Sequence, residues 1–175
     1  MAYIVLKGEK CMSNEIENIQ VEELHKEIDL IQGCINRMAN NSFLLKGWLV
    51  SIIAVVVILS LDEMNKFVIT LMVIMITISF WYLDSYFLRM EKLYRKMYEW
   101  VLENRKQGNR DFQYDLNPHR FDTQVERESN IMYSKTMRWF YGIIILLIVM
   151  ISVYYSWDNS LGKYQIQSEK KSSPE

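Results

Sequence analysis

Apolar residues in this chain are gathered into three long runs, and most charged residues lie between the runs. The first run, 43–61, contains a single charge, Lys46, and the second, 67–83, contains none. The third run, 137–157, has aromatic residues at both of its ends. An α-helix rises about 1.5 Å per residue, so roughly 20 apolar residues cross the ~30 Å hydrocarbon layer of a membrane. The pattern therefore predicts three transmembrane helices, the first two of which form a hairpin over 43–88.

Two other arrangements fit parts of this pattern. A buried hairpin in a soluble helical bundle needs a polar face, and residues 48–61 offer only Ser51 and Ser60 for one. The third run also suits a helix that lies at the membrane surface or contacts another subunit. Its length and its many consecutive apolar residues favour a transmembrane helix instead.

The segment before the first run has the pattern of an amphipathic helix. Its apolar residues alternate three and four positions apart, as in a helix that packs along one seam, and they are Val21, Leu24, Ile28, Ile31, Ile35 and Met38. Ser13 is placed to cap this helix, and acidic residues follow it in the first turn. We expect residues 1–42 to form an N-terminal amphipathic cytoplasmic helix. Its seam packs on the later amphipathic helix or on a neighbouring subunit, and residues 40–42 either cap a new helix or continue this one.

A second amphipathic segment follows the hairpin. Residues 84–104 carry apolar side chains at helical spacing with basic residues between them, which predicts one helix that leaves the membrane without a break. Residues 106–130 are polar and contain a glycine and a proline, so we expect a long loop there with a short element near 112–116. Segment 89–136 is thus expected to be a cytoplasmic helix and loop, and 158–175 a mobile polar tail.

The distribution of basic residues predicts which parts lie in the cytoplasm. Segment 89–138 carries eleven lysines and arginines, whereas the turn 61–66 carries only Lys66. Cytoplasmic loops are enriched in these residues, so we expect 1–42 and 89–136 on the inner side of a bacterial inner membrane. Five residues are expected at the membrane–water boundary, namely Lys46, Trp48, Trp81, Trp139 and Trp157.

Three polar residues on the second apolar helix are candidates for a functional site. Thr70, Thr77 and Asp84 are seven positions apart and so lie along nearly one face of a helix. Polar side chains at membrane depth either bond to another helix or line a water-filled path. One hairpin is too small to enclose a path, so the second alternative requires a homo-oligomeric ring of this chain.

Enzymatic chemistry has little support in the sequence, and the net charge of −1 argues against a dedicated nucleic-acid binder. The two histidines belong to no metal or nucleophile motif, and the two cysteines lack metal-binding spacing. We therefore expect a protein that is not an enzyme and has no cofactor and no metal. One alternative is a membrane-tethered ribonuclease that uses His119 with Arg110 or Arg120, although the arginine-to-histidine spacing of HEPN ribonucleases is absent. Another is a passive scaffold or sensor that recruits a partner through 89–138.

Two stretches overlap the ends of the hairpin, IQGCINRMANNSFLLKGW at 31–48 and FWYLDSYFLRMEKLYRKMYEWV at 80–101. Over residues 20–104 the chain resembles small membrane proteins of bacterial defence islands, most of all the membrane accessory proteins of type VI-B CRISPR systems. The resemblance implies a ring-shaped pore that depolarises the host membrane during phage infection, with an RNA-guided effector or its RNA products as activating partner. That family has also been assigned a divergent HEPN motif, and no functional residue of the family carries over to this sequence.

The combined expectation is an all-α integral membrane protein in the lipid bilayer. It has three transmembrane helices and long amphipathic cytoplasmic helices, and it is assembled as a homo-oligomeric ring.

Overall fold

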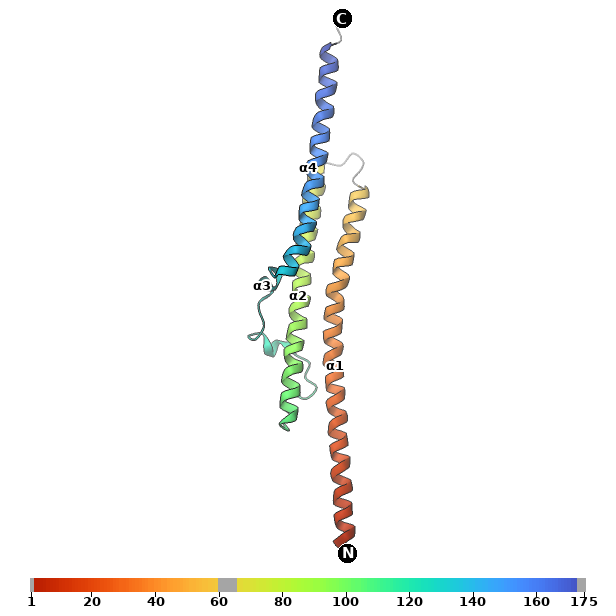
Figure 1. The fold of residues 1–175 in the computed structure, drawn as a ribbon, viewed down its shortest axis with the longest axis vertical. Coiled ribbons are helices and arrows are strands. Elements are labelled where there is room, and N and C mark those ends of the chain that lie inside the picture. Colours follow the sequence, from red (N-terminus) through yellow and green to blue (C-terminus); the bar gives the residue numbers. More distant parts are fainter. Residues whose placement is uncertain (1, 60–65, 173–175) are drawn as a thin grey trace. The chain divides into compact units, whose positions relative to one another are not determined.

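The computed structural model describes the backbone of residues 2–59 and 66–172 and, within these, the side chains of 18–58, 67–154 and 157. In chain order the elements are α1 (Ala2–Leu59), α2 (Lys66–Lys106), the 3₁₀ helix η1 (Pro118–Phe121), α3 (Glu128–Met132) and α4 (Lys135–Ser172), as drawn in Figure 1. The described residues contain no strand, which confirms the all-α prediction.

α1 is one uninterrupted helix of 58 residues. It begins at Ala2, so Ser13 lies inside the helix and the prediction that this residue caps its start is wrong. Residues 40–42 continue the helix and do not cap a second one. The first proline of the chain is Pro118, so no residue of α1 lacks the backbone N–H that a continuing helix needs.

α2 continues beyond the second apolar run without a break, as the sequence predicts, and ends ahead of Gly108. This glycine has a φ of 76°, and its N–H donates to the carbonyl of Arg105. A left-handed residue just past the last turn is a common way to end a helix, and glycine adopts that conformation without strain. α4 extends past the third apolar run to Ser172, because the polar residues there include many good helix formers and no proline.

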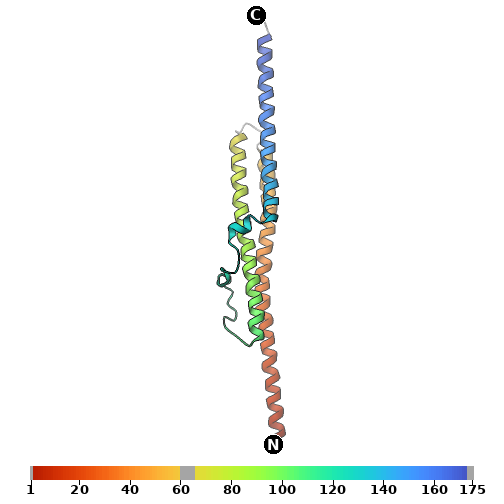
Figure 2. The same cartoon turned by 60° about the vertical axis from the view of Figure 1, so that its left-hand side comes forward.

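The chain divides into two compact units. Unit 1 comprises Met1–Asn41 and Phe87–Glu126, and unit 2 comprises Ser42–Tyr86 and Arg127–Glu175. Between α2 and α4 the chain passes through η1 and α3, and this connection can be followed in Figure 2.

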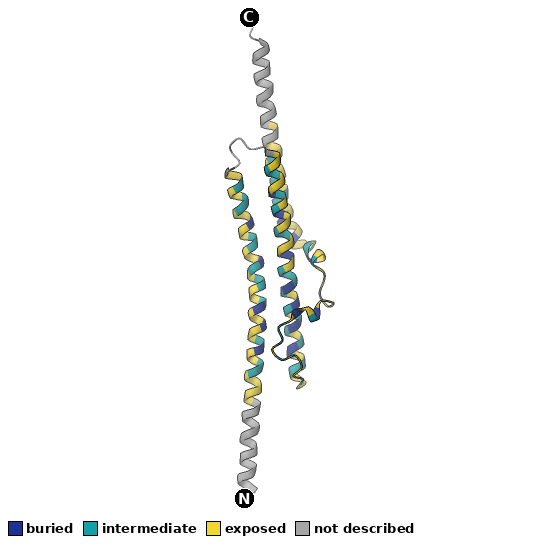
Figure 3. Ribbon diagram, turned by 180° about the vertical axis from the view of Figure 1, so that it is seen from behind, coloured by how far each residue is buried: buried dark blue, intermediate teal, exposed yellow. Residues whose placement is uncertain are grey.

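The core of unit 1 forms where α1 packs on α2. Its buried residues are Ile31, Met90, Leu93, Met97, Val101 and Phe121, and Leu24, Ile35 and Met38 are partly buried against them. Figure 3 shows such buried positions recurring along both helices between exposed ones. Four of the six residues of the predicted seam, Leu24, Ile31, Ile35 and Met38, therefore pack on the later amphipathic helix of the same chain, whereas Val21 is 47% exposed.

A buried ion pair joins the same two helices of unit 1. Arg105 donates to the carboxylate of Glu27 from Nε at 2.9 Å and from Nη2 at 2.8 Å. Only 8% of the arginine side chain and 2% of the glutamate side chain are exposed. Nη1 of Arg105 also donates to the carbonyls of Asn109 and Asp111, while Glu27 accepts from the N–H of Tyr114. The pair thus ties the following loop to both helices.

Residues 112–116 form neither a helix nor a strand, so the prediction of a short element there is wrong, and 111–114 form a turn. Phe112 and Tyr114 have φ values of 55° and 61°, a left-handed conformation that costs free energy for residues with a side chain. The short helix is η1, where the side chain of Asn117 accepts from the N–H of His119 at 3.1 Å and a proline occupies the first turn.

Three helices of the described chain are long and apolar enough to cross a membrane. They are Asn18–Ile58, Phe67–Lys106 and Lys135–Tyr154, and an 18-residue window in each has a mean hydropathy of 2.0. Between 11% and 17% of the residues in these windows are buried within the chain, so most of the apolar side chains face outward. Hydrocarbon is a favourable surrounding for such a surface and water is not, which is consistent with a membrane location.

Candidate functional site

Asp84 is the centre of a polar cluster in unit 2. It directly follows the second apolar run, and its side chain is fully buried. Oγ of Ser42 donates to its Oδ1 at 2.5 Å, and the hydroxyl of Tyr141 donates to its Oδ2 at 3.0 Å. The ammonium of Lys46 lies 2.5 Å from the same Oδ2. Because Ser42 and Lys46 come from α1 and Tyr141 from α4, this carboxylate links all three long helices of unit 2.

Lys46 is also held by contacts close to it in sequence. Its Nζ donates to Oγ of Ser42 at 2.9 Å and to the carbonyl of Ser42 at 3.3 Å, one turn earlier in α1. The ammonium is 6.0 Å from the centre of the Phe140 ring, at the limit of cation–π range. The lysine side chain keeps 27% of its surface exposed. The residue expected at the membrane boundary therefore has a buried acidic partner.

An aromatic contact positions Tyr141. Its ring stacks on Trp81 with centroids 5.4 Å apart and planes 8° apart. The indole N–H of Trp81 donates to the carbonyl of Met132 at 3.0 Å, and Tyr133 meets the indole edge to face. Trp81, predicted as a boundary residue, thus orients the tyrosine whose hydroxyl reaches Asp84.

A second contact joins α2 and α4 about three helical turns from the contact between Trp81 and Tyr141, and this one is polar. Oγ1 of Thr70 donates to Oγ of Ser152 at 3.0 Å. Thr70 precedes Trp81 by eleven residues, and Ser152 follows Tyr141 by eleven residues. Eleven residues are about three helical turns, so both contacts lie on one face of each helix, as expected for an antiparallel pair.

The three aligned polar residues of the second apolar helix have different contacts. Asp84 and Thr70 form hydrogen bonds with other helices of the same chain. This agrees with the alternative in which polar side chains at membrane depth bond to another helix. Thr77 is fully buried, and its hydroxyl donates to the carbonyl of Val73 in its own helix at 2.8 Å. None of the three is exposed, so these side chains do not by themselves mark a water-filled path through one chain.

The other tryptophans expected at the membrane boundary are on the surface of unit 2. Trp48, Trp139 and Trp157 are 65%, 65% and 67% exposed. An exposed indole combines a large apolar ring with one N–H donor, and such side chains are enriched where a bilayer meets water. The position of these three residues at a membrane boundary stays a prediction.

The residues of the ribonuclease alternative lie in unit 1 and have separate partners. Arg110 contacts Glu23 at 3.3 Å, and Nδ1 of His119 lies 3.3 Å from Asp122. The guanidinium of Arg120 lies over aromatic rings, the nearest centre being 4.2 Å away. Among the residues with described side chains, no group of three or more histidines, cysteines or carboxylates is arranged to hold a metal.

Asp84 and Lys46 were both candidate residues in the sequence, but no contact between them was predicted. Ser42 and Tyr141 were not predicted to belong to the site. One signal was present: Lys46 lies near the start of the first apolar run, and Asp84 follows the end of the second. A hairpin brings these two ends to the same depth, where a lone charge is costly. The contribution of Tyr141 depends on the packing of α4, which the local pattern does not encode.

No protein-family model, curated protein or solved structure matches this chain.

Proposed function

We propose that this chain is a non-enzymatic subunit of a homo-oligomeric conduit in the bacterial inner membrane, and that the conduit depolarises the cell in CRISPR-associated antiviral defence. The observation that carries the proposal is the ion pair of Lys46 and Asp84 among three helices of membrane length. Ionisable side chains at membrane depth are costly, and they commonly mark ion pathways or contacts between helices. The resemblance of residues 20–104 to type VI-B accessory proteins supports the antiviral part of the proposal.

The hydrogen bonding of the polar side chains in unit 2 supports the assembly of several copies of this chain. The buried cluster satisfies them within the chain, and the outward faces of the helices are mainly apolar. Two serines on these faces are exposed, Ser51 on α1 and Ser79 on α2, and each donates to a carbonyl of its own helix. Several copies around one axis would gather these hydroxyls into rings along a path that no single chain can enclose.

The proposed topology places unit 1 in the cytoplasm, because its segment 89–126 and the nearby 127–138 carry most of the basic residues that flank the membrane helices. An RNA-guided effector or its RNA products would then reach unit 1 as the activating partner. Protease added to inside-out membrane vesicles should cleave the 107–117 loop, and protease added to right-side-out vesicles should leave it intact. The reverse pattern would contradict this sidedness.

Ion flux through the purified full-length chain in liposomes tests the conduit. Vesicles with an imposed potassium gradient and a potential-sensitive dye should depolarise when the protein is present and hold their potential when it is absent. Asp84→Leu should reduce the flux strongly, because it breaks the contact that links the three helices of each subunit.

The matched control is Glu99→Leu, which removes an exposed carboxylate of unit 1 paired with Lys96. Its flux should equal that of the natural sequence. Folded, oligomeric protein that carries no ions in these vesicles, with or without the effector and its RNA, would refute the conduit.

A further inference from the structure

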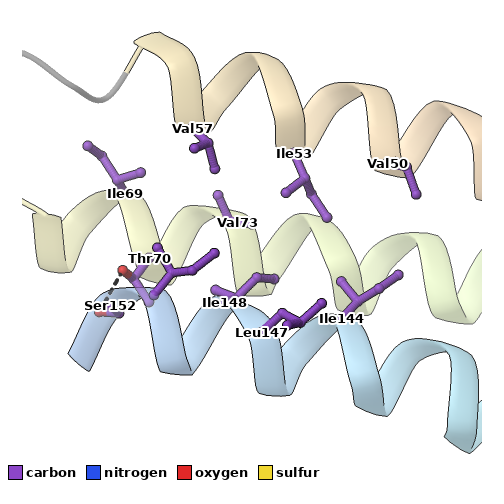
Figure 4. A pocket seen from close by; sticks show the side chains of 11 residues that line it. Val50, Ile53, Val57, Ile69, Thr70, Val73, Ile144, Leu147, Ile148 and Ser152 are labelled. Atoms are coloured by element: carbon purple, nitrogen blue, oxygen red, sulfur yellow. Dashed lines mark hydrogen bonds between the residues drawn. The ribbon is translucent and has the colours of Figure 1, made fainter. Parts of the chain in front are cut away.

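An apolar crevice of about 280 Å³ lies between α1, α2 and α4 in unit 2 (Figure 4). Nine of the eleven residues that line it are aliphatic. The other two, Thr70 and Ser152, are hydrogen-bonded to each other, as the dashed line in Figure 4 shows. A lining of this kind favours hydrocarbon and offers little to a charged or strongly polar ligand.

The crevice lies at the middle of the three apolar helices. On α1 it extends from Val50 to Val57, and on α4 it extends from Ile144 to Ser152. At about 1.5 Å per residue, counted from residues 43 and 137, these stretches lie roughly 10 to 22 Å into a hydrocarbon layer ~30 Å thick. On the side of the helices that faces lipid, neither water nor lipid headgroups are available at that depth. The occupant must therefore come from the hydrocarbon of the membrane or from another protein helix.

The crevice opens onto the outward face of unit 2. Val50, Leu147 and Ile151 are 53%, 50% and 44% exposed, whereas Val73 is 4% exposed. The crevice thus continues into the apolar surface of the helices, and its lining extends further along the helices than across them. If the crevice were empty, its lining residues would lose packing contacts on that side. Water would not replace those contacts, because an apolar cavity does not hold water.

We propose that this crevice binds one acyl chain of a membrane glycerolipid, which lies parallel to α1 and α4 with its end against Val73. A flexible hydrocarbon chain enters sideways from the bilayer, fills an elongated apolar space and needs no polar partner. The proposal requires that unit 2 is embedded in a membrane, but it does not depend on ion conduction. Its failure is therefore distinguishable from failure of the conduit.

Photolabelling of the full-length chain tests the proposal. The protein is reconstituted in phosphatidylcholine vesicles that contain a phosphatidylcholine with a diazirine near the end of one acyl chain, and labelled residues are mapped by mass spectrometry after illumination. Val73 should be labelled as strongly as Met75, an outward residue of α2 that is 59% exposed and does not line the crevice. Label on Met75 with none on Val73 would overturn the proposal while still showing that α2 contacts lipid.

A substitution that fills the crevice provides the second arm. Ile148→Trp should lower the labelling of Val73 by about tenfold, as expected when bound lipid loses ~1.4 kcal/mol of affinity. The matched control is Val149→Trp, one position along α4, where the side chain is 43% exposed and outside the crevice. It should leave the labelling of Val73 unchanged. If the Ile148→Trp protein does not elute from a size-exclusion column as the natural protein does, Ile148→Phe replaces it. Undiminished labelling of Val73 in a folded variant would contradict the binding of an acyl chain in this crevice.

Discussion

Asp84→Leu is expected to lower the free energy of unfolding of the detergent-solubilised protein by roughly 3 kcal/mol, the lower end of the range for breaking a buried ion pair. The substitution leaves the ammonium of Lys46 without its counter-ion, and it leaves the hydroxyl of Tyr141 with a longer contact of 3.5 Å to the carbonyl of Phe80. The lower end applies because Lys46 keeps 27% of its side chain exposed and regains some solvation. Thermal unfolding followed by tryptophan fluorescence measures the change, since Trp81 stacks on Tyr141.

Removing both charges is the matched control. Lys46→Met combined with Asp84→Leu leaves no unpaired ion, so the double variant should recover most of the stability that Asp84→Leu loses. Glu99→Leu, which breaks a contact with Lys96 at the surface of unit 1, should change stability by about 0.5 kcal/mol or less. A protein with Asp84→Leu that is as stable as the natural sequence would show that the cluster does not hold the helices together.

Glu27→Leu should have an effect of similar or larger size in unit 1, about 3–5 kcal/mol, because both partners of this ion pair are almost completely buried. Arg105 loses both of its bonds to the carboxylate, and the N–H of Tyr114 loses its acceptor. The loop that contains Tyr114 should then be held less tightly to α1, where its contacts with Glu23 remain. Limited proteolysis should show faster cleavage within 107–117, together with a lower unfolding temperature.

The double variant Glu27→Leu with Arg105→Met should restore much of the unfolding temperature without restoring the slower cleavage of the loop. The reason is that it removes the unpaired charge but still leaves the loop without its contacts to the pair. Glu22→Leu is the surface control, because its pairing with Lys26 is highly exposed, and it should change neither readout. A Glu27→Leu protein whose 107–117 loop is cleaved no faster than that of the natural sequence would contradict the role assigned to the pair.

The helices of this chain were largely predictable because their signals are local. Runs of membrane length appear directly in the sequence, and the spacing of Leu24, Ile31 and Ile35 indicated the side of α1 that packs on α2. Helix ends were less predictable. Ser13 suits a helix start, but a serine is also tolerated inside a helix when the residues before it, here 2–12, continue the helix.

The contacts of the candidate site depend on tertiary packing, which local patterns do not specify. Asp84 and Lys46 were visible as charges near apolar runs, but Tyr141 reaches Asp84 only because α4 packs on α2 in one register. The loop in unit 1 is a similar case. Phe112 and Tyr114 hold left-handed conformations that no glycine signals, in a loop that is tied down by Glu27, more than eighty positions away in the sequence.

The molar mass of the detergent-solubilised particle, corrected for bound detergent, tests the proposed assembly most directly. One chain has a mass of 21.0 kDa. We predict a discrete particle whose protein mass is a whole-number multiple of this value and large enough for a closed ring, because three helices cannot enclose a path by themselves. A folded particle that contains one chain would contradict the conduit.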